Sequence, residues 1–220
     1  SLSAPGRVLF GIGIGGEDRH EMEICGVDPA KRGTQTNHSM VALRQLLTGE
    51  STSYDCEFFS FSDAKIRPAP SPEIPMIVGG RSEAAIARVA KYGDGWIGVW
   101  CSANRFAQVC ATIKDTAPTC RENPPKFQHG MQVWCGFASK QATARSLLAN
   151  EMEQMYRVPF TKFEKYCPYG SPEQVAEFLN GYVEQGAKIL NIKPCAATVE
   201  EGIVAVAEVK RLLSLVRSHD

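Results

Sequence analysis

The sequence predicts an α/β fold built on a parallel sheet. Five short apolar runs are nearly continuous rather than alternating, as expected for strands that are covered on both faces. Amphipathic helical patterns separate these runs, and glycines or capping residues mark the ends of several helices. The chain has 220 residues, enough to bury a substantial core. The expected strands are residues 7–14, 75–78, 95–100, 131–137 and 188–192.

Helices are expected where apolar side chains recur at helical spacing. The expected helices are residues 36–47, 82–92, 142–156, 171–186 and a last one that begins at 198. Ser171 and Gln174 form a capping box with Pro172 at the first helical position, and Gly186 ends that helix. Gly93 stands at the expected C′ position of the helix over 82–92.

We expect one domain over residues 1–220, with two segments that interrupt the strand–helix rhythm. Residues 50–70 alternate and then become proline-rich, which indicates an excursion outside the main sheet. Residues 139–170 form a long connection with a helical start and an aromatic tail. Long connections after strands often carry substrate contacts in α/β proteins.

Composition excludes several classes of function. Lys plus Arg and Asp plus Glu both number 24, so the net charge is zero. Without a basic run, nucleic acid and anionic membranes are not expected partners. No apolar stretch approaches the roughly 20 residues that span a bilayer. The eight cysteines show no C-x-x-C spacing, and we expect reduced thiols in a cytoplasmic protein without a metal site.

Gly11, Gly13 and Gly16 match the dinucleotide-binding pattern G-x-G-x-x-G, directly after an apolar run. In a Rossmann unit the third glycine leads into an apolar helix whose amino end faces the pyrophosphate. Here the charged residues 17–21 follow instead, and no helical stripe is expected before about residue 36. The context therefore argues against an NAD site.

A better phosphate site follows the second expected strand, where Gly79, Gly80, Arg81 and Ser82 lead into a helix. The glycines let the backbone approach an anion, and the first free N–H groups of the helix supply positive potential. Arg81 could add a charged fork. The same residues also fit an ordinary strand-to-helix turn with a serine N-cap. Phosphate sites of this kind recur in β/α barrels.

A series of short motifs runs through the chain in a fixed order. They are Leu2-Ser3-x-x-Gly6-Arg7, Leu9-x-Gly11-x-Gly13-x-Gly15, Cys25-Gly26-Val27 with Arg32-Gly33, Leu47-x-Gly49-Glu50, Phe58-Phe59-x-Phe61, Ile66-Arg67-Pro68, Val78-Gly79-Gly80-Arg81-Ser82, Gly93-Asp94-Gly95-Trp96 and Gly170-Ser171-Pro172-Glu173-x-Val175-Ala176. As an ordered set, they resemble the luciferase-like flavin-dependent oxidoreductases, the family of bacterial luciferase and of many F420-dependent reductases.

The resemblance implies a (β/α)8 TIM barrel of the luciferase-like type in which this chain starts near the fourth strand. Strands 4–8 would then be visible, and the first three βα units would be missing. Five strands cannot close a barrel. We therefore expect either that further βα units precede Ser1 or that a partner covers the exposed edge.

The resemblance also implies a cofactor, FMN or coenzyme F420, at the mouth of the barrel. Gly13 and Gly15 are expected to face its flat ring, because side chains there would collide with it. Residues 79–82 are expected to hold its phosphate. Ile14 stands where bacterial luciferase has an arginine that helps to bind the FMN phosphate, which leaves Arg81 as the expected cationic contact.

Trp100, at the end of a strand, and Tyr166 and Tyr169, in the long connection, are candidates for a substrate pocket. Ordinary packing is the alternative for each. The acidic residues 17–21 could shape the substrate side, and His20 is the histidine nearest the expected mouth. The sequence assigns no catalytic acid or base.

The function implied is a flavin-dependent oxidoreductase or monooxygenase that acts on a small organic substrate. One alternative is an F420-dependent dehydrogenase or reductase without oxygen chemistry, and another is a non-catalytic, flavin-binding degenerate barrel. The expected partner is the small-molecule substrate, and the sequence leaves a homodimer open.

Overall fold

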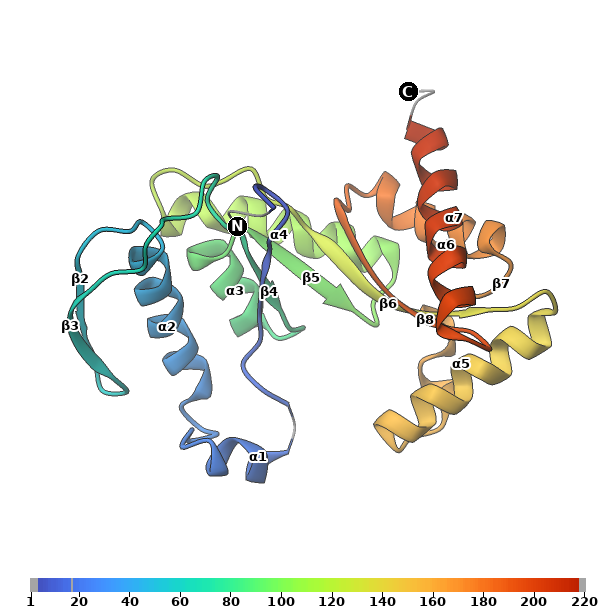
Figure 1. The fold of residues 1–220 in the computed structure, drawn as a ribbon, viewed down its shortest axis with the longest axis horizontal. Coiled ribbons are helices and arrows are strands. Elements are labelled where there is room, and N and C mark those ends of the chain that lie inside the picture. Colours follow the sequence, from blue (N-terminus) through green and yellow to red (C-terminus); the bar gives the residue numbers. More distant parts are fainter. Residues whose placement is uncertain (1–3, 17, 218–220) are drawn as a thin grey trace. The chain divides into compact units, whose positions relative to one another are not determined.

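All five predicted strands are present, and their pairing is parallel, which confirms the α/β fold class (Figure 1). The computed structural model describes residues 4–16 and 18–217. The chain forms two compact units, Ser1–Trp96 with Thr112–Phe127, and Ile97–Ala111 with Gln128–Asp220. The single domain over 1–220 stays a prediction. The five strands are β1 (Phe10–Ile12), β4 (Met76–Gly79), β5 (Gly95–Val99), β6 (Gly130–Phe137) and β8 (Ile189–Cys195).

The parallel pair β1–β4 forms the centre of the first unit, with Ile12 opposite Val78. Three helices belong to this unit, α1 (Arg19–Ile24), α2 (Arg32–Leu46) and α3 (Glu83–Tyr92). Val78 is 1% exposed and packs near the end of α3, since a Cβ on Gly93 would lie 3.0 Å from its Cγ2. Because side chains alternate along strands, Gly11, which pairs with Ile77, belongs to the opposite face of the pair.

Residues 50–70 hold a separate two-stranded antiparallel sheet, β2 (Thr52–Asp55) with β3 (Ser60–Ala64). Tyr54 lies opposite Phe61, and their ring centroids are 6.3 Å apart. The phenol oxygen of Tyr54 is 2.9 Å from Nδ1 of His38 on α2. The hairpin therefore packs beside α2, as Figure 1 shows at its blue and teal end.

In the second unit β6 pairs with β5 through Ile97–Val99 and with β8 along seven residues. Its other elements are the short strand β7 (Tyr169–Gly170) and the helices α5 (Gln141–Tyr156), α6 (Pro172–Glu184) and α7 (Val199–Arg217), while α4 (Ala103–Cys120) has residues in both units. A Cβ on Gly136 would contact α5, whereas Pro194 lies against Gly202 of α7. Gly136 pairs with Cys195, so these two residues share a face of the sheet, and Pro194, the neighbour of Cys195, belongs to the other face. Helices α5 and α7 therefore cover opposite faces of this sheet.

Helix ends follow the predicted chemistry in two cases. Ser171 and Gln174 form both hydrogen bonds of the capping box of α6. Gly186 follows that helix with a φ of +89°, a conformation that favours glycine.

No helix in the part of the chain that the structure describes is both long and apolar enough to cross a membrane.

The prediction that Gly93 stands at the C′ position is wrong. Gly93 is the C-cap of α3 and has extended backbone, with a φ of −89°. Packing requires glycine at this position, because a Cβ would lie within 3.2 Å of both Val78 and Val89. The sequence predicts no helical stripe before about residue 36, and helices are present there without one, since α1 occupies Arg19–Ile24 and α2 begins at Arg32. Met22 is the only buried side chain of α1, so apolar periodicity could not reveal it.

Candidate functional site

The two glycine-containing turns singled out by the sequence lie at the same end of the β1–β4 pair. The strands are parallel, with Ile12 opposite Val78, so Gly13, just after β1, and Gly79, the last residue of β4, lie at the same edge. The carboxyl edge of a parallel sheet is where α/β proteins bind ligands. The geometry therefore permits one ligand to reach both turns.

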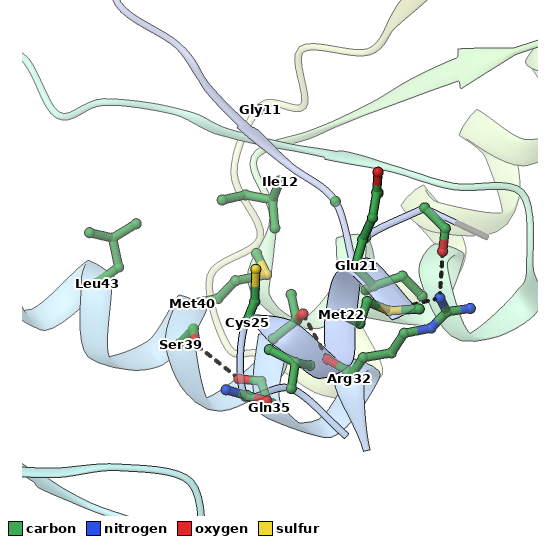
Figure 2. A pocket seen from close by; sticks show the side chains of 16 residues that line it. Gly11, Ile12, Glu21, Met22, Cys25, Arg32, Gln35, Ser39, Met40 and Leu43 are labelled. Atoms are coloured by element: carbon green, nitrogen blue, oxygen red, sulfur yellow. Dashed lines mark hydrogen bonds between the residues drawn. The ribbon is translucent and has the colours of Figure 1, made fainter. Parts of the chain in front are cut away.

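A cavity of about 540 Å³ lies at the tip of β1, and its volume is in the range of small-molecule sites (Figure 2). The glycine-rich tip forms one wall, and side chains of α1 and α2 form the other. Gly13 and Gly15 both line it. The lining consists of Gly11, Ile12, Gly13, Ile14, Gly15, Gly16, Glu21, Met22, Cys25, Val27, Arg32, Gln35, Thr36, Ser39, Met40 and Leu43.

Gly13 and Gly15 are glycines for different reasons. A Cβ placed on Gly13 would meet no atom within 4 Å, so the space beside this backbone is open to a flat group. Gly15 has a φ of +93°, and a Cβ there would approach the Sδ atom of Met22 to 3.3 Å. Gly13 thus fits the predicted ring contact, whereas the local backbone already requires glycine at Gly15.

Arg32 fixes the glycine-rich tip to α2. Its Nη1 donates to the Gly16 carbonyl at 2.7 Å and contacts the Sδ atom of Met22 at 3.3 Å (Figure 2).

Asp18 caps α1 by accepting from the His20 N–H at 2.9 Å. A carboxylate therefore occupies the amino end of this six-residue helix, which supports the argument against a pyrophosphate here.

The turn between β4 and α3 is tightly constrained. Gly80 has a φ of +118°, and a Cβ there would lie 2.8 Å from the Cβ of Ala85. The Oγ atom of Ser82 accepts from the Ala85 N–H at 3.2 Å as the N-cap of α3. Trp96 donates its Nε1–H to the Gly80 carbonyl at 2.7 Å. Gly80, Arg81 and Ser82 are exposed, and the residues of this turn are not part of the cavity lining.

The start of β4 is held by a different part of the same motif. The Asp94 carboxylate accepts from the Met76 N–H at 2.8 Å and forms an ion pair with Arg44. Arg121 donates to the carbonyl of Gly93 at 2.6 Å. These contacts lie at the amino end of the strand, away from the glycine turns, so they stabilise the fold there.

Trp100, Tyr166 and Tyr169 all belong to the second unit. Trp100 directly follows β5 with a φ of +49°, and its ring centroid lies 4.6 Å from that of Phe163. Tyr166 and Tyr169 pack against the core cluster around Trp134. Their part in a substrate pocket stays a prediction.

An ionic network holds the segment that carries these tyrosines. Glu164 accepts from Arg145 at 2.6 and 2.9 Å and from the Tyr169 hydroxyl at 2.8 Å. The hydrogen bonds from Arg145 and then Tyr169 lower the pKa of Glu164 to about 2. The same carboxylate raises the pKa of Tyr169. The network favours one conformation of residues 160–169.

The remaining sequence candidates fall at scattered places. His20 is exposed on α1, and Glu21 lines the cavity. All eight cysteines are free. Within residues 4–16 and 18–217, no group of three or more His, Cys, Asp or Glu side chains could hold a metal ion. Three residues that the sequence analysis singled out lie outside the described residues, namely Leu2, Ser3 and Glu17.

Sequence reasoning missed the helical wall of the cavity. Arg32, Gln35, Ser39 and Leu43 recur at spacings of three and four residues along α2, which places them on one helix face. The stripe mixes polar and apolar groups, so an apolar count does not detect it. A search for any side-chain stripe beside the glycine-rich strand would have found it.

Comparisons with known proteins agree on one group. The sequence model of a family described as luciferase-like monooxygenase matches residues 2–188. An uncharacterized protein of Mycobacterium tuberculosis (strain ATCC 25618 / H37Rv) is 38% identical over 88 residues, which cover 40% of this chain and 30% of that relative. The chain thus matches less than a third of that relative's length.

Two solved structures are similar in fold. One is an F420-dependent secondary alcohol dehydrogenase in complex with an F420–acetone adduct, with a TM-score of 0.79 and 19% identity over 94% of this chain and 70% of that one. The other is the monooxygenase RslO1 from Streptomyces bottropensis, with a TM-score of 0.73 and 16% identity over 97% of this chain and 69% of that one.

Proposed function

Because the chain belongs to the luciferase-like monooxygenase family, we propose that it is an oxidoreductase domain that binds FMN or coenzyme F420 and acts on a small organic substrate. One observation carries this proposal. The open backbone at Gly13 and the constrained turn at Gly80 lie at the same carboxyl edge of one parallel strand pair. A ligand with a flat ring and an anionic tail matches that pair of features.

The tip of β1 fits the ring. Beyond Gly13 and its two chain neighbours, no described atom lies within 4 Å of the place where a Cβ of Gly13 would stand, and the adjoining cavity offers both apolar and polar walls. A tricyclic ring has an apolar end and a polar end, so mixed walls suit it. When bound, the ring would supply the redox chemistry, as electron donor in monooxygenation or as hydride acceptor in dehydrogenation, and the chain would orient it and exclude water.

The β4–α3 turn fits the phosphate. Its exposed residues Gly80, Arg81 and Ser82 lead into the amino end of a ten-residue helix. The helix dipole and the Arg81 guanidinium attract an anion, and the Ser82 hydroxyl can donate while its oxygen caps the helix. Glu83, in the first turn of α3, acts in the opposite direction because its carboxylate repels an anion.

Dehydrogenation with F420, without oxygen chemistry, is the second candidate. Ile14 stands where bacterial luciferase has a phosphate-binding arginine, which weakens the case for tight FMN binding. The similar structure with the higher TM-score of the two is the F420-dependent alcohol dehydrogenase. Monooxygenation with FMN is supported by the family description and by the likeness to RslO1.

Titration of the chain with FMN and with F420 tests the proposal. Binding should perturb the visible spectrum of one cofactor and raise the thermal midpoint of the protein. Turnover of candidate small organic substrates, assayed both with reduced FMN and oxygen and with oxidised F420, would support an enzyme. Binding without turnover would favour a non-catalytic flavin-binding barrel, and failure to bind either cofactor would reject the proposal.

A further inference from the structure

The motif Gly93-Asp94-Gly95-Trp96 holds both ends of β4. Asp94 binds the Met76 N–H at the start of that strand. Trp96, two residues later, donates its indole N–H to the Gly80 carbonyl just beyond the other end, at 2.7 Å. Trp96 is only 2% exposed, so the donor of this hydrogen bond is shielded from water, while the acceptor belongs to the exposed residue Gly80. The motif thereby connects the core to the exposed turn.

The hydrogen bond fixes the orientation of one peptide group. Gly80 and Arg81 are joined by a trans peptide, since the cis bonds among the described residues precede Pro68 and Pro72. In a planar trans peptide the C=O and N–H groups point in opposite directions. Because the Gly80 carbonyl is directed at Trp96, the N–H of Arg81 is directed away from the indole. The positive end of the peptide dipole therefore also points away from the indole.

The peptide group between Gly80 and Arg81 needs a restraint, because one of the two residues that it joins is a glycine. Gly80 has a φ of +118°, and glycine also tolerates the conformations reached when a neighbouring peptide flips. A flipped peptide would direct the partial negative charge of its carbonyl outward, where it would repel an anion. Ser82 caps α3 through Ala85 and does not restrain this carbonyl.

We propose that Trp96 is the positioning residue for the cofactor phosphate, because it holds the Gly80 carbonyl inward and so turns the peptide dipole of the β4–α3 turn toward the anion. This inference rests on the proposed function, since it assumes that the turn receives the phosphate of FMN or F420. It adds a buried side chain that touches no ligand, and it gives the last residue of the motif a role.

Trp96→Phe tests the proposal, because phenylalanine keeps the aromatic packing and removes the donor. The readout is the ratio of the dissociation constants of riboflavin and FMN, two ligands that differ by the phosphate. The wild type should prefer FMN by at least about tenfold. Trp96→Phe should reduce that ratio by roughly threefold to tenfold and leave riboflavin affinity within about twofold. If only F420 binds, F420 and its phosphate-free chromophore replace the pair.

Trp134→Phe is the matched control, since Trp134 is 5% exposed and lies on β6 of the other unit. It should keep the wild-type ratio. A Trp96→Phe protein that also keeps the wild-type ratio would overturn the inference. Wild-type protein without any preference for the phosphorylated ligand would reject the proposed phosphate site itself, so the two failures are distinguishable.

A second measurement covers the case in which Trp96→Phe does not fold. In the wild type, the indole N–H resonance of Trp96 should shift on addition of FMN and remain in place on addition of riboflavin. Equal shifts with both ligands, or no shift with saturating FMN, would overturn the positioning role.

Discussion

Two separate features, the backbone conformation and the packing, require that residue 80 has no side chain. Its φ of +118° is rarely adopted by residues with a Cβ, and the Cβ of Ala85 would lie only 2.8 Å away. Gly186 shares the positive φ, at +89°, but a Cβ at that position would meet no atom within 4 Å. A comparison of the two glycines therefore separates the cost of backbone strain from the cost of a steric clash.

Gly80→Ala should lower both stability and cofactor affinity. The turn must shift to relieve the contact with Ala85, which we expect to cost about 2–3 kcal/mol of unfolding free energy. FMN affinity should fall more than riboflavin affinity because the turn faces the phosphate. Gly186→Ala, the control, should cost about 1 kcal/mol and leave both affinities unchanged. Denaturant unfolding and flavin titration measure these effects, and equal loss in both variants would contradict the assignment.

Glu83→Gln should strengthen the binding of a phosphorylated cofactor. The change removes a negative charge from the first turn of α3, beside the proposed phosphate position. We expect FMN affinity to rise by roughly twofold to fivefold at low salt, with less gain at high salt. Riboflavin serves as the internal control and should bind as before. Unchanged FMN affinity in low salt would place the phosphate elsewhere.

Individual residues were predictable where the chemistry is local. Ser171 and Gln174 could be assigned from their spacing, because a capping box involves only neighbouring residues. The contact of Trp96 with Gly80 joins residues 16 positions apart and depends on how the chain folds. Gly93 shows the same limit, since its need for glycine comes from Val78 on β4.

Among the elements, the strands were more predictable than the short helices. The runs for β6 and β8 are apolar over most of their length, and their predicted bounds differ from the observed ones by three residues or fewer. In contrast, α1 has a single buried side chain, and the first turn of α2 begins with Arg32 and Gly33. Such helices follow from their caps and contacts rather than from an apolar stripe.

His129, next to the start of β6, should make the stability of the second unit depend on pH. Burial lowers the pKa of His129 from 6.5 to about 4. The folded state therefore favours the neutral ring, and stability is lost as pH falls from 6.5 toward 4, where the unfolded chain binds the proton more readily. We expect a loss of roughly 2–3 kcal/mol across this window.

Denaturant unfolding at several pH values measures this dependence. His129→Gln should flatten the curve between pH 6.5 and 4. His20→Gln, which changes an exposed ring on α1, is the control and should keep the wild-type slope. An unaltered slope in His129→Gln would show that other groups cause the loss.

At the scale of the whole molecule, the order of strands and helices predicted the parallel α/β class, and the resemblance of the ordered motifs to the family implied the barrel. The parallel pairing of the five predicted strands and of the short β7, the family match and the likeness to the longer alcohol dehydrogenase structure confirm the fold as that of a luciferase-like TIM barrel, of which this chain forms a part. The sequence could indicate the α2 stripe that forms one wall of the cavity, but not that this wall faces the tip of β1, because that arrangement depends on the folded backbone.

A crystal structure of the chain grown with FMN or, if only F420 binds, with F420 tests the proposed site most directly. We expect the ring to lie against the backbone at Gly13 and the phosphate to lie within hydrogen-bond distance of the turn formed by residues 79–82. A bound cofactor whose phosphate lies at any other part of the chain would contradict this expectation.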